Sequence, residues 1–377
     1  MPSITLPHVP YYVAAPPTKE NLEYADLAII DISKASSEEG RAALAIELRE
    51  ALLNLGFFYV IVNHISAQTT RMFDIADVPF SAVADDEKQN YASTRRQDGL
   101  LQGYTTRADN DGRVRDQLDQ YCIHRDVTKR RHPEALLPLL PEIQEFSSHN
   151  HFNVLHPYPE VNVCPGVLSE DSDIYIFLRL IARSLELPED TLLKKHVFDA
   201  TGETAVRFIK YYPRTEEEES KTKNVWLQGH TAFTILWSQP VTALQIQTRE
   251  GKWRWIRHIE NALVVNVGDA MDFLTGGYYK GTIHRVIQPA VDQRNYTRLG
   301  LFYFCLPNDD IKLVPMVESP VLQRVGIQRR CEDSEAPTME NWRKARTMAF
   351  GLSKLKNGKE DGVEEEIIHG VIIKHYD

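Results

Sequence analysis

Gly229-His230-Thr231-Ala232-Phe233 and, further along the chain, Gly281-Thr282-Ile283-His284-Arg285-Val286 are the two stretches that decide the fold of this protein. Each histidine stands near the end of an expected strand and has a glycine close by, which lets backbone approach a site closely. A lone histidine on a strand is more often a satisfied polar residue than a ligand. Whether His230 and His284 are ligands or ordinary polar residues therefore has to be inferred from the segments around them.

Short apolar segments follow one another after residue 205, with Gly, Pro and Asn between them. The segment Asn266-Val267-Gly268-Asp269-Ala270-Met271 is typical of a tight turn between two strands. Regular short strands of this kind predict a double-sheet roll or a barrel. The strands that we expect cover residues 206–212, 234–237, 244–248, 253–256, 262–267 and 299–305.

The first part of the chain predicts an extended arm followed by a strand and a helix. Residues 1–26 are rich in proline and tyrosine and show no periodicity, whereas Ile29-Ile30-Asp31-Ile32 is a short strand pattern. Ser36 and Glu39 are spaced as a capping box, and leucines recur at helical spacing after them. Gly56 is expected to end this helix as its C-cap.

A strand is expected over residues 57–62, and a second helix over residues 172–187 with Pro188 ending it. The acidic run Glu216 to Glu219 predicts a solvated loop. The highly charged stretch from Lys354 to Asp377 predicts a surface tail with limited structure.

These residues together resemble a known family. The segment from Phe208 to Pro307 resembles the Fe(II)/2-oxoglutarate-dependent oxygenases of the group that includes isopenicillin N synthase and the plant flavonoid and gibberellin dioxygenases. Gly229-His230-Thr231 resembles the first half of that family's HxD motif, and His284-Arg285-Val286 resembles its distal histidine. With Gly56-Phe57-Phe58, Gly103-Tyr104 and Gly268-Asp269, the resemblance covers roughly residues 27 to 315.

The resemblance implies a mainly β fold with flanking α-helices, namely a double-stranded β-helix or jelly roll that follows an N-terminal helical region. It implies four parts. We expect an extended arm over residues 1–26, a helical non-haem dioxygenase region over 27–200, the jelly-roll core over 201–315, and a C-terminal helix with a charged tail over 316–377.

The resemblance also implies a metal site with one ligand missing. His230 and His284 would hold Fe(II) through neutral imidazoles, and an incomplete protein shell would leave positions for the cosubstrate and O2. The family's third ligand is an acid two residues after the first histidine. That position is Ala232.

The cosubstrate site is implied by the strand Arg298-Leu299-Gly300-Leu301-Phe302-Tyr303-Phe304, which resembles the family's Arg-x-Ser strand. Arg298 would form a bidentate pair with the distal carboxylate of 2-oxoglutarate, and Tyr212 resembles the tyrosine that helps to hold that carboxylate. Gly300 stands where the family usually has serine. Arg294 is a second candidate, and Arg298 is preferred because the strand after it aligns without a gap.

Three interpretations of Ala232 are open. It is an engineered change in an ordinary hydroxylase, desaturase or cyclase; or it is natural and the vacated position holds chloride, as in the iron/2-oxoglutarate halogenases; or the protein is a binding or regulatory relative without redox activity. The activity expected in the first two cases is oxidation of a C–H bond of a small organic molecule, such as a specialised metabolite.

The composition limits the partners. The 377 residues carry a formal net charge of -10 and a pI near 5.8, which disfavours binding to nucleic acid or to an anionic membrane. The start Met1-Pro2-Ser3-Ile4 lacks the pattern of a signal peptide, so we expect a cytoplasmic protein. The four cysteines have no CxxC spacing and predict neither a disulfide framework nor a zinc site. A small-molecule substrate is the expected partner.

Overall fold

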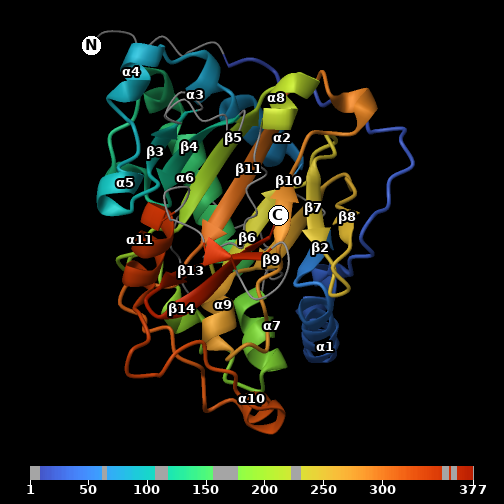
Figure 1. Ribbon diagram of the computed structural model, residues 1–377, viewed down its shortest axis with the longest axis vertical. Coiled ribbons are helices and arrows are strands. Elements are labelled where there is room, and N and C mark those ends of the chain that lie inside the picture. The colour runs from blue at the N-terminus through green and yellow to red at the C-terminus, as the bar shows by residue number, and fades with distance from the viewer. Residues whose placement is uncertain are drawn as a thin grey trace.

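A large twisted sheet runs through the middle of the protein, and a smaller sheet faces it (Figure 1). This computed structural model describes residues 9–61, 66–106, 118–155, 177–221, 231–349, 356–357 and 363–376. His230 and His64 lie outside these ranges. The following description concerns the described residues.

The main sheet has eight strands in the order β1-β2-β9-β6-β11-β5-β4-β3. Its neighbours pair antiparallel, apart from β1 and β2, which are parallel. Its strands are β1 (Ile29–Asp31), β2 (Phe57–Ile61), β3 (Gly103–Thr105), β4 (Leu118–His124), β5 (Ala205–Tyr211), β6 (Phe233–Trp237), β9 (Ala262–Val267) and β11 (Arg298–Cys305).

The smaller sheet has the order β10-β7-β8, with β7 (Leu244–Gln247), β8 (Trp253–Trp255) and β10 (His284–Val286). Ile246 and Leu244 of this sheet pack with Phe302, Ile209 and Val264 of the main sheet in one apolar cluster. Two antiparallel sheets with a shared apolar interior form a jelly roll, so the predicted fold is confirmed.

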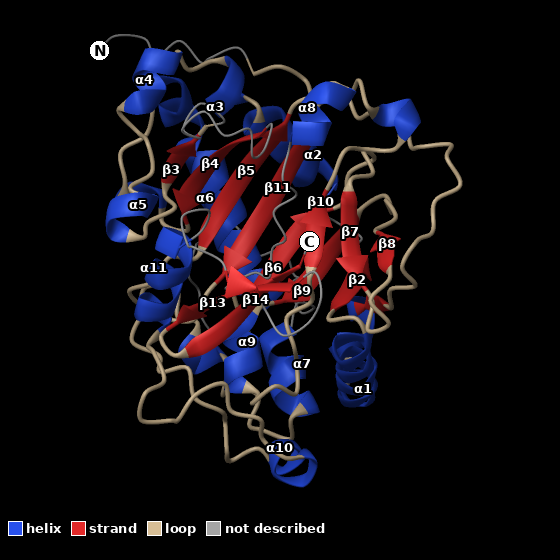
Figure 2. Cartoon of the chain, in the orientation of Figure 1, coloured by secondary structure: helices blue, strands red, loops and turns tan. Residues whose placement is uncertain are grey.

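Helices cover the opposite face of the main sheet, and Figure 2 shows α2 and α6 passing behind its strands. A second and larger apolar cluster fills the space between the helices and the sheet. The helices are α1 (Glu38–Asn54), α2 (Ser66–Ala76), α3 (Val78–Ser81), α4 (Asp85–Gln89), α5 (Arg95–Asp98), α6 (Leu140–His149), α7 (Phe177–Ser184), α8 (Glu216–Lys221), α9 (Asp269–Leu274), α10 (Pro320–Val325) and α11 (Met339–Ala349).

Helix α1 confirms one predicted end and corrects the other. Its N-cap is Ser37, whose side chain accepts from the Gly40 amide at 3.0 Å, because residues 32–36 form a short 3-10 helix that includes Ser36. Gly56 has a φ of 62°, the left-handed conformation expected just beyond a helix C-terminus. Of the helix expected over 172–187, the structure describes α7, and residues 172–176 lie outside the described ranges.

The acidic run is a helix rather than the expected loop. Thr215 and Glu218 form a reciprocal cap, in which the Glu218 amide donates to Thr215 Oγ1 at 3.2 Å and the Thr215 amide donates to Glu218 Oε2 at 2.8 Å. This capping box, with acidic residues in the first turn, stabilises α8 despite its charge.

The expectation of a tail with limited structure was wrong for residues 363–376. They form the hairpin β13 (Val363–Ile368) and β14 (Val371–Tyr376), which pairs with β12 (Lys356–Asn357). His369 and Gly370 both have positive φ, as a two-residue hairpin turn of type I′ requires. Within the described ranges, every helix is too short or too polar to cross a membrane.

Candidate active site

Arg298 is a buried cation at the first position of β11. Its exposed fraction is only 3%, yet its Nε and Nη1 atoms have no hydrogen-bond partner among the described residues. Burial lowers the pKa of Arg298, and Tyr211 and Tyr12 partly offset this shift. A buried guanidinium with free donors is costly unless an anion is bound to it, so this end of the interior is suited to a carboxylate.

Tyr211 is the tyrosine that lies against Arg298. The two residues are directly paired across β5 and β11, and the guanidinium carbon is 5.1 Å from the centre of the Tyr211 ring. The hydroxyl of Tyr212, which the sequence assigned to the carboxylate, instead donates to Asp119 Oδ2 at 2.8 Å. Successive side chains of a strand point to opposite faces, and this alternation is the signal that separates the two tyrosines.

Tyr12 reaches the same region from the N-terminal arm. Its ring stacks on Phe73 with centroids 4.8 Å apart, and its amide donates to Asp74 Oδ1 at 2.7 Å. Burial raises the pKa of Tyr12, and the charge of Arg298 partly offsets this. The sequence did not single out Tyr12, because nothing in an extended arm shows where the arm packs.

Position 300 favours glycine because the Phe302 ring occupies the space that a side chain there would need. A Cβ added at Gly300 would lie 2.6 Å from Phe302 Cε2, and the Phe302 ring stacks in turn on Phe304 with centroids 5.7 Å apart. The serine that the resemblance leads one to expect at this position would therefore displace an aromatic side chain. The packing of this strand therefore explains why position 300 is glycine where the family usually has serine.

Arg294, the alternative cosubstrate residue, lines the same small cavity as Arg298 but is already engaged in an ion pair. Its Nη1 donates to Glu216 Oε1 of α8 at 3.0 Å. Arg298 carries no such ion pair with a described residue. This difference supports the preference for Arg298.

His284 begins β10 and is directly paired with Ile246 of β7. Its Nδ1 lies 2.9 Å from the Thr282 carbonyl oxygen, which can only accept, so Nδ1 carries the proton and Nε2 is left as a base. Burial lowers the pKa of His284, which keeps the imidazole neutral at pH 7. Its ring also contacts Phe57 edge-on, with centroids 5.4 Å apart. A neutral, oriented imidazole of this kind suits a metal ion.

Ala232 is fully buried in the turn before β6. Its amide donates to the Cys305 carbonyl at 3.0 Å, and its own carbonyl accepts from the Gly268 amide at 3.2 Å. Because Cys305 ends β11 and Arg298 begins it, Ala232 and Arg298 lie toward opposite ends of that strand. The structure therefore separates a cationic end of the interior from an end at which the expected acid is a methyl group.

Nearby acids do not replace the missing one. Asp269 Oδ1 is 3.1 Å from Arg330 Nη1, and Asp269 Oδ2 is 3.4 Å from Arg346 Nε. Asp272 also pairs with Arg330, at 3.7 Å. Throughout the described ranges, His, Cys, Asp and Glu side chains form no group of three that could hold a metal.

Two family models match the chain. The 2OG-Fe(II) oxygenase superfamily model matches residues 203–307, and the model for the N-terminal region of non-haem dioxygenases, described as "non-haem dioxygenase in morphine synthesis N-terminal", matches residues 27–141. The chain belongs to the 2OG-Fe(II) oxygenase superfamily. The first match contains both histidines, Ala232 and Arg298.

Two curated relatives match this oxygenase over similar numbers of residues. The chain is 26% identical over 290 residues to the 2-oxoglutarate-Fe(II) type oxidoreductase ppzC of Metarhizium majus, with 69% of this chain and 73% of the relative covered. It is 28% identical over 280 residues to the 2-oxoglutarate-dependent dioxygenase frbJ of a Dothideomycetidae species, with 71% of each chain covered.

A solved structure gives the same fold. A 2OG-Fe(II) oxygenase family protein of Caulobacter crescentus superposes with a TM-score of 0.66 at 18% identity and covers 86% of this oxygenase and 99% of its own chain. At this identity the similarity supports the fold alone.

The superfamily name implies 2-oxoglutarate and Fe(II), and the residues present fit the first better than the second. The unpartnered donors of Arg298 fit one carboxylate of 2-oxoglutarate. Of the family's three iron ligands, His284 offers a neutral imidazole, His230 lies outside the described ranges, and Ala232 has no donor atom. Fe(II) held by the two histidines would therefore receive no carboxylate from position 232.

Proposed function

We propose that this protein is a non-haem Fe(II)/2-oxoglutarate-dependent oxidoreductase that oxidises a C–H bond of a small organic molecule, in the class of specialised metabolites. The observation that carries the proposal is Arg298, a buried cation whose Nε and Nη1 donors have no hydrogen-bond partner among the described residues. A relative that no longer bound 2-oxoglutarate would have no use for so costly a group. Arg298 thus supports cosubstrate binding, and turnover separates an oxidoreductase from the third interpretation, a binding protein without redox activity.

Each site residue has one proposed role. Arg298, with the Tyr211 ring beside it, holds the distal carboxylate of 2-oxoglutarate in a bidentate pair. His284, oriented by Thr282, and His230 offer neutral imidazoles to Fe(II), which with O2 supplies the oxidising power. Gly300 contributes no hydroxyl, which costs about 1 kcal/mol of cosubstrate binding at most.

A second candidate function is halogenation with chloride beside Ala232. The observation that favours it is local charge. The side chain at position 232 is an uncharged, fully buried methyl group, and Asp269 and Asp272 are paired with arginines. An anion placed there meets little repulsion from neighbouring carboxylates.

Cosubstrate binding tests the role of Arg298. We expect anaerobic titration with 2-oxoglutarate to show binding by the unchanged protein and about 10- to 100-fold weaker binding by Arg298→Lys, since lysine cannot form the bidentate pair. The matched control is Arg294→Lys, which changes an arginine engaged by Glu216 and should bind normally. Equal losses in both variants would refute the assignment.

Turnover then separates oxygenation from halogenation. The protein and its Ala232→Asp variant would be loaded with Fe(II) and 2-oxoglutarate without O2, then exposed to O2 with and without chloride, and succinate would be measured. Chloride-dependent succinate formation by the unchanged chain indicates halogenation. Succinate from the Asp variant alone indicates that an acid-bearing parent carries out the oxygenation. If neither protein binds 2-oxoglutarate, the enzyme assignment fails.

A further inference from the structure

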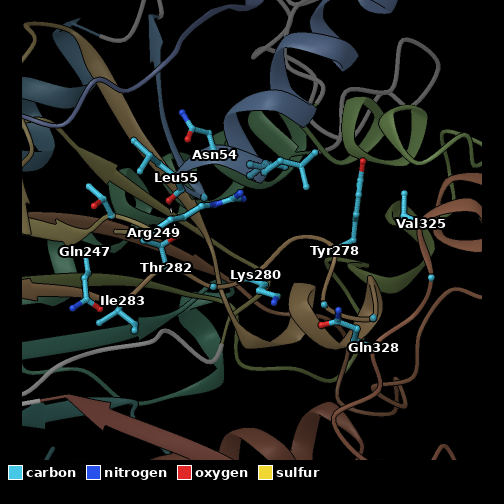
Figure 3. A pocket seen from close by; sticks show the side chains of 18 residues that line it. Asn54, Leu55, Gln247, Arg249, Tyr278, Lys280, Thr282, Ile283, Val325 and Gln328 are labelled. Atoms are coloured by element: carbon cyan, nitrogen blue, oxygen red, sulfur yellow. Dashed lines mark hydrogen bonds between the residues drawn. The ribbon is translucent and has the colours of Figure 1, made fainter. Parts of the chain in front are cut away.

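A cavity of about 530 Å³ lies beside the roll, and Figure 3 shows the side chains that line it. Its wall comes from the end of α1, residues 247–249 after β7, residues 276–283 before β10, and residues 325–328 after α10. Neither Arg298 nor His284 lines it. Its volume lies within the range of small-molecule sites, roughly 300–1,000 Å³.

The charged side chains of this wall are both cations. Arg249 and Lys280 line the cavity, are exposed to solvent, and form no ion pair with a described residue. No Asp or Glu is among the described residues of the wall. Two acids lie near it: Glu250, which follows Arg249 and is fully exposed, and Asp272, whose carboxylate pairs with Arg330 at 3.7 Å. The cavity therefore presents a net positive charge.

The rest of the wall is divided between apolar and hydrogen-bonding groups. Leu52 and Leu53 come from the last turn of α1, and Ile283 comes from the segment before β10. In Figure 3, Tyr278 and Gln328 lie on one side of Arg249 and Lys280, and Gln247 and Ile283 lie on the other. An apolar surface next to a pair of cations suits a molecule with a hydrocarbon body and an anionic end.

The backbone around the cavity is fixed in place. Gly56 has a positive φ, and a Cβ there would lie 2.3 Å from Thr282 Oγ1, so only glycine allows the two segments to approach. The Thr282 hydroxyl donates in turn to the Leu55 carbonyl at 2.5 Å. These contacts join the end of α1 to the segment that carries Lys280. They hold the two sides of the cavity in a fixed relative position.

We propose that this cavity is a second binding site, separate from the cosubstrate site, for a small amphipathic anion whose carboxylate or phosphate is held by Arg249 and Lys280. The apolar part of the ligand packs against Leu53 and Ile283, which are partly exposed. The proposal does not depend on oxygenase activity, because it concerns binding alone.

Calorimetric titration of the full-length protein tests it, with octanoate, octyl phosphate and octylamine as probes. We expect both anions to bind, with the tighter of the two identifying the headgroup, and octylamine to bind at least tenfold more weakly. The double variant Arg249→Gln/Lys280→Gln should bind the anions at least tenfold more weakly than the unchanged protein. Lys252→Gln, a change of an exposed cation outside the cavity, is the matched control and should bind normally.

Several outcomes would overturn the proposal: no binding of either anion, equal binding of octylamine, or unchanged affinity in a double variant with a normal thermal unfolding curve. Arg298→Lys separates the two sites, because it should weaken 2-oxoglutarate binding and leave octanoate binding intact. If Arg298→Lys weakened octanoate binding equally, the anion would occupy the cosubstrate site and the second site would be disproved.

Discussion

The two ends of strand β11 differ in what they keep of an oxygenase site. At its start, Arg298 is buried beside Tyr211, and no described residue accepts from its Nε and Nη1 donors. Beyond its end, the backbone of Ala232 is bonded to Cys305, but the side chain offers no ligand. The start of the strand thus presents a buried cation that suits an anion, whereas the position where the family's acid is expected holds an uncharged methyl group. In the proposed site, alanine at position 232 affects what completes the metal site and leaves the cosubstrate end unchanged.

The largest expected effect is at the metal end. In the proposed metal site, Ala232→Asp should tighten Fe(II) binding about 100-fold, since it would add an anionic ligand to the two proposed histidine ligands. Anaerobic Fe(II) titration measures this. Ala232→Asn is the matched control, because it has the same shape without the charge. An equal gain in the Asn variant would show that charge at position 232 does not govern metal affinity.

At the cosubstrate end, removal of the unpaired charge should stabilise the protein without ligand. Arg298→Met should raise the free energy of unfolding by about 2 kcal/mol, because a desolvated cation is replaced by an apolar chain of similar length. Denaturant unfolding in the absence and presence of 2-oxoglutarate tests this. The cosubstrate should stabilise the unchanged protein only. A variant that is less stable without ligand would show that Arg298 has a structural partner.

Acid should lower the free energy of unfolding, because the buried side chain of His196 resists protonation in the folded protein. Burial lowers the pKa of His196 to about 4, so between pH 6.5 and 4 the unfolded chain binds the proton that the folded protein excludes. Stability is full above pH 6.5 and decreases as the pH falls through this window, by about 2 kcal/mol at pH 5. The measurement is unfolding at pH 7 and pH 5 for the protein and for His196→Gln, whose pH dependence should be smaller. Identical pH dependence in both would contradict it.

The smallest effect concerns Gly300. Gly300→Ser should destabilise the protein by about 1–2 kcal/mol, because its Cβ overlaps the Phe302 ring. A second substitution, Phe302→Leu, should recover part of this loss, and a double-mutant cycle on unfolding free energies measures the coupling. Additive effects would show that Phe302 is not what keeps position 300 small.

Much of the roll could be predicted from its strand pattern. The strands expected over 206–212, 262–267 and 299–305 correspond to β5, β9 and β11 within a residue or two, because short alternating segments between turn residues have few other ways to bury their apolar faces. Helix α8 was missed because its charge was weighed and the capping pair Thr215 and Glu218 was not.

The residues of the proposed site were selected by residue type and spacing, which do not determine their contacts. Arg298 was identified from the strand that follows it, and the structure adds that Arg294 is engaged by Glu216. Tyr212 was assigned to the cosubstrate from its motif, but the register of β5 against β11 places Tyr211 opposite Arg298. A motif gives spacing along the chain, whereas the face of a strand depends on which residue its neighbour pairs with.

The sequence by itself determined the jelly roll through its strand pattern and the family through its resemblance to known oxygenases, and it shows alanine where that family has an acid, because strand patterns and motifs are local properties of the chain. Only the tertiary structure decided that Tyr12 packs near Arg298, that Phe302 covers Gly300, and that Arg249 and Lys280 share one cavity. These contacts join segments far apart in sequence or depend on the direction of a side chain. Burial and pairing across the sheets fix both, and no local pattern encodes them.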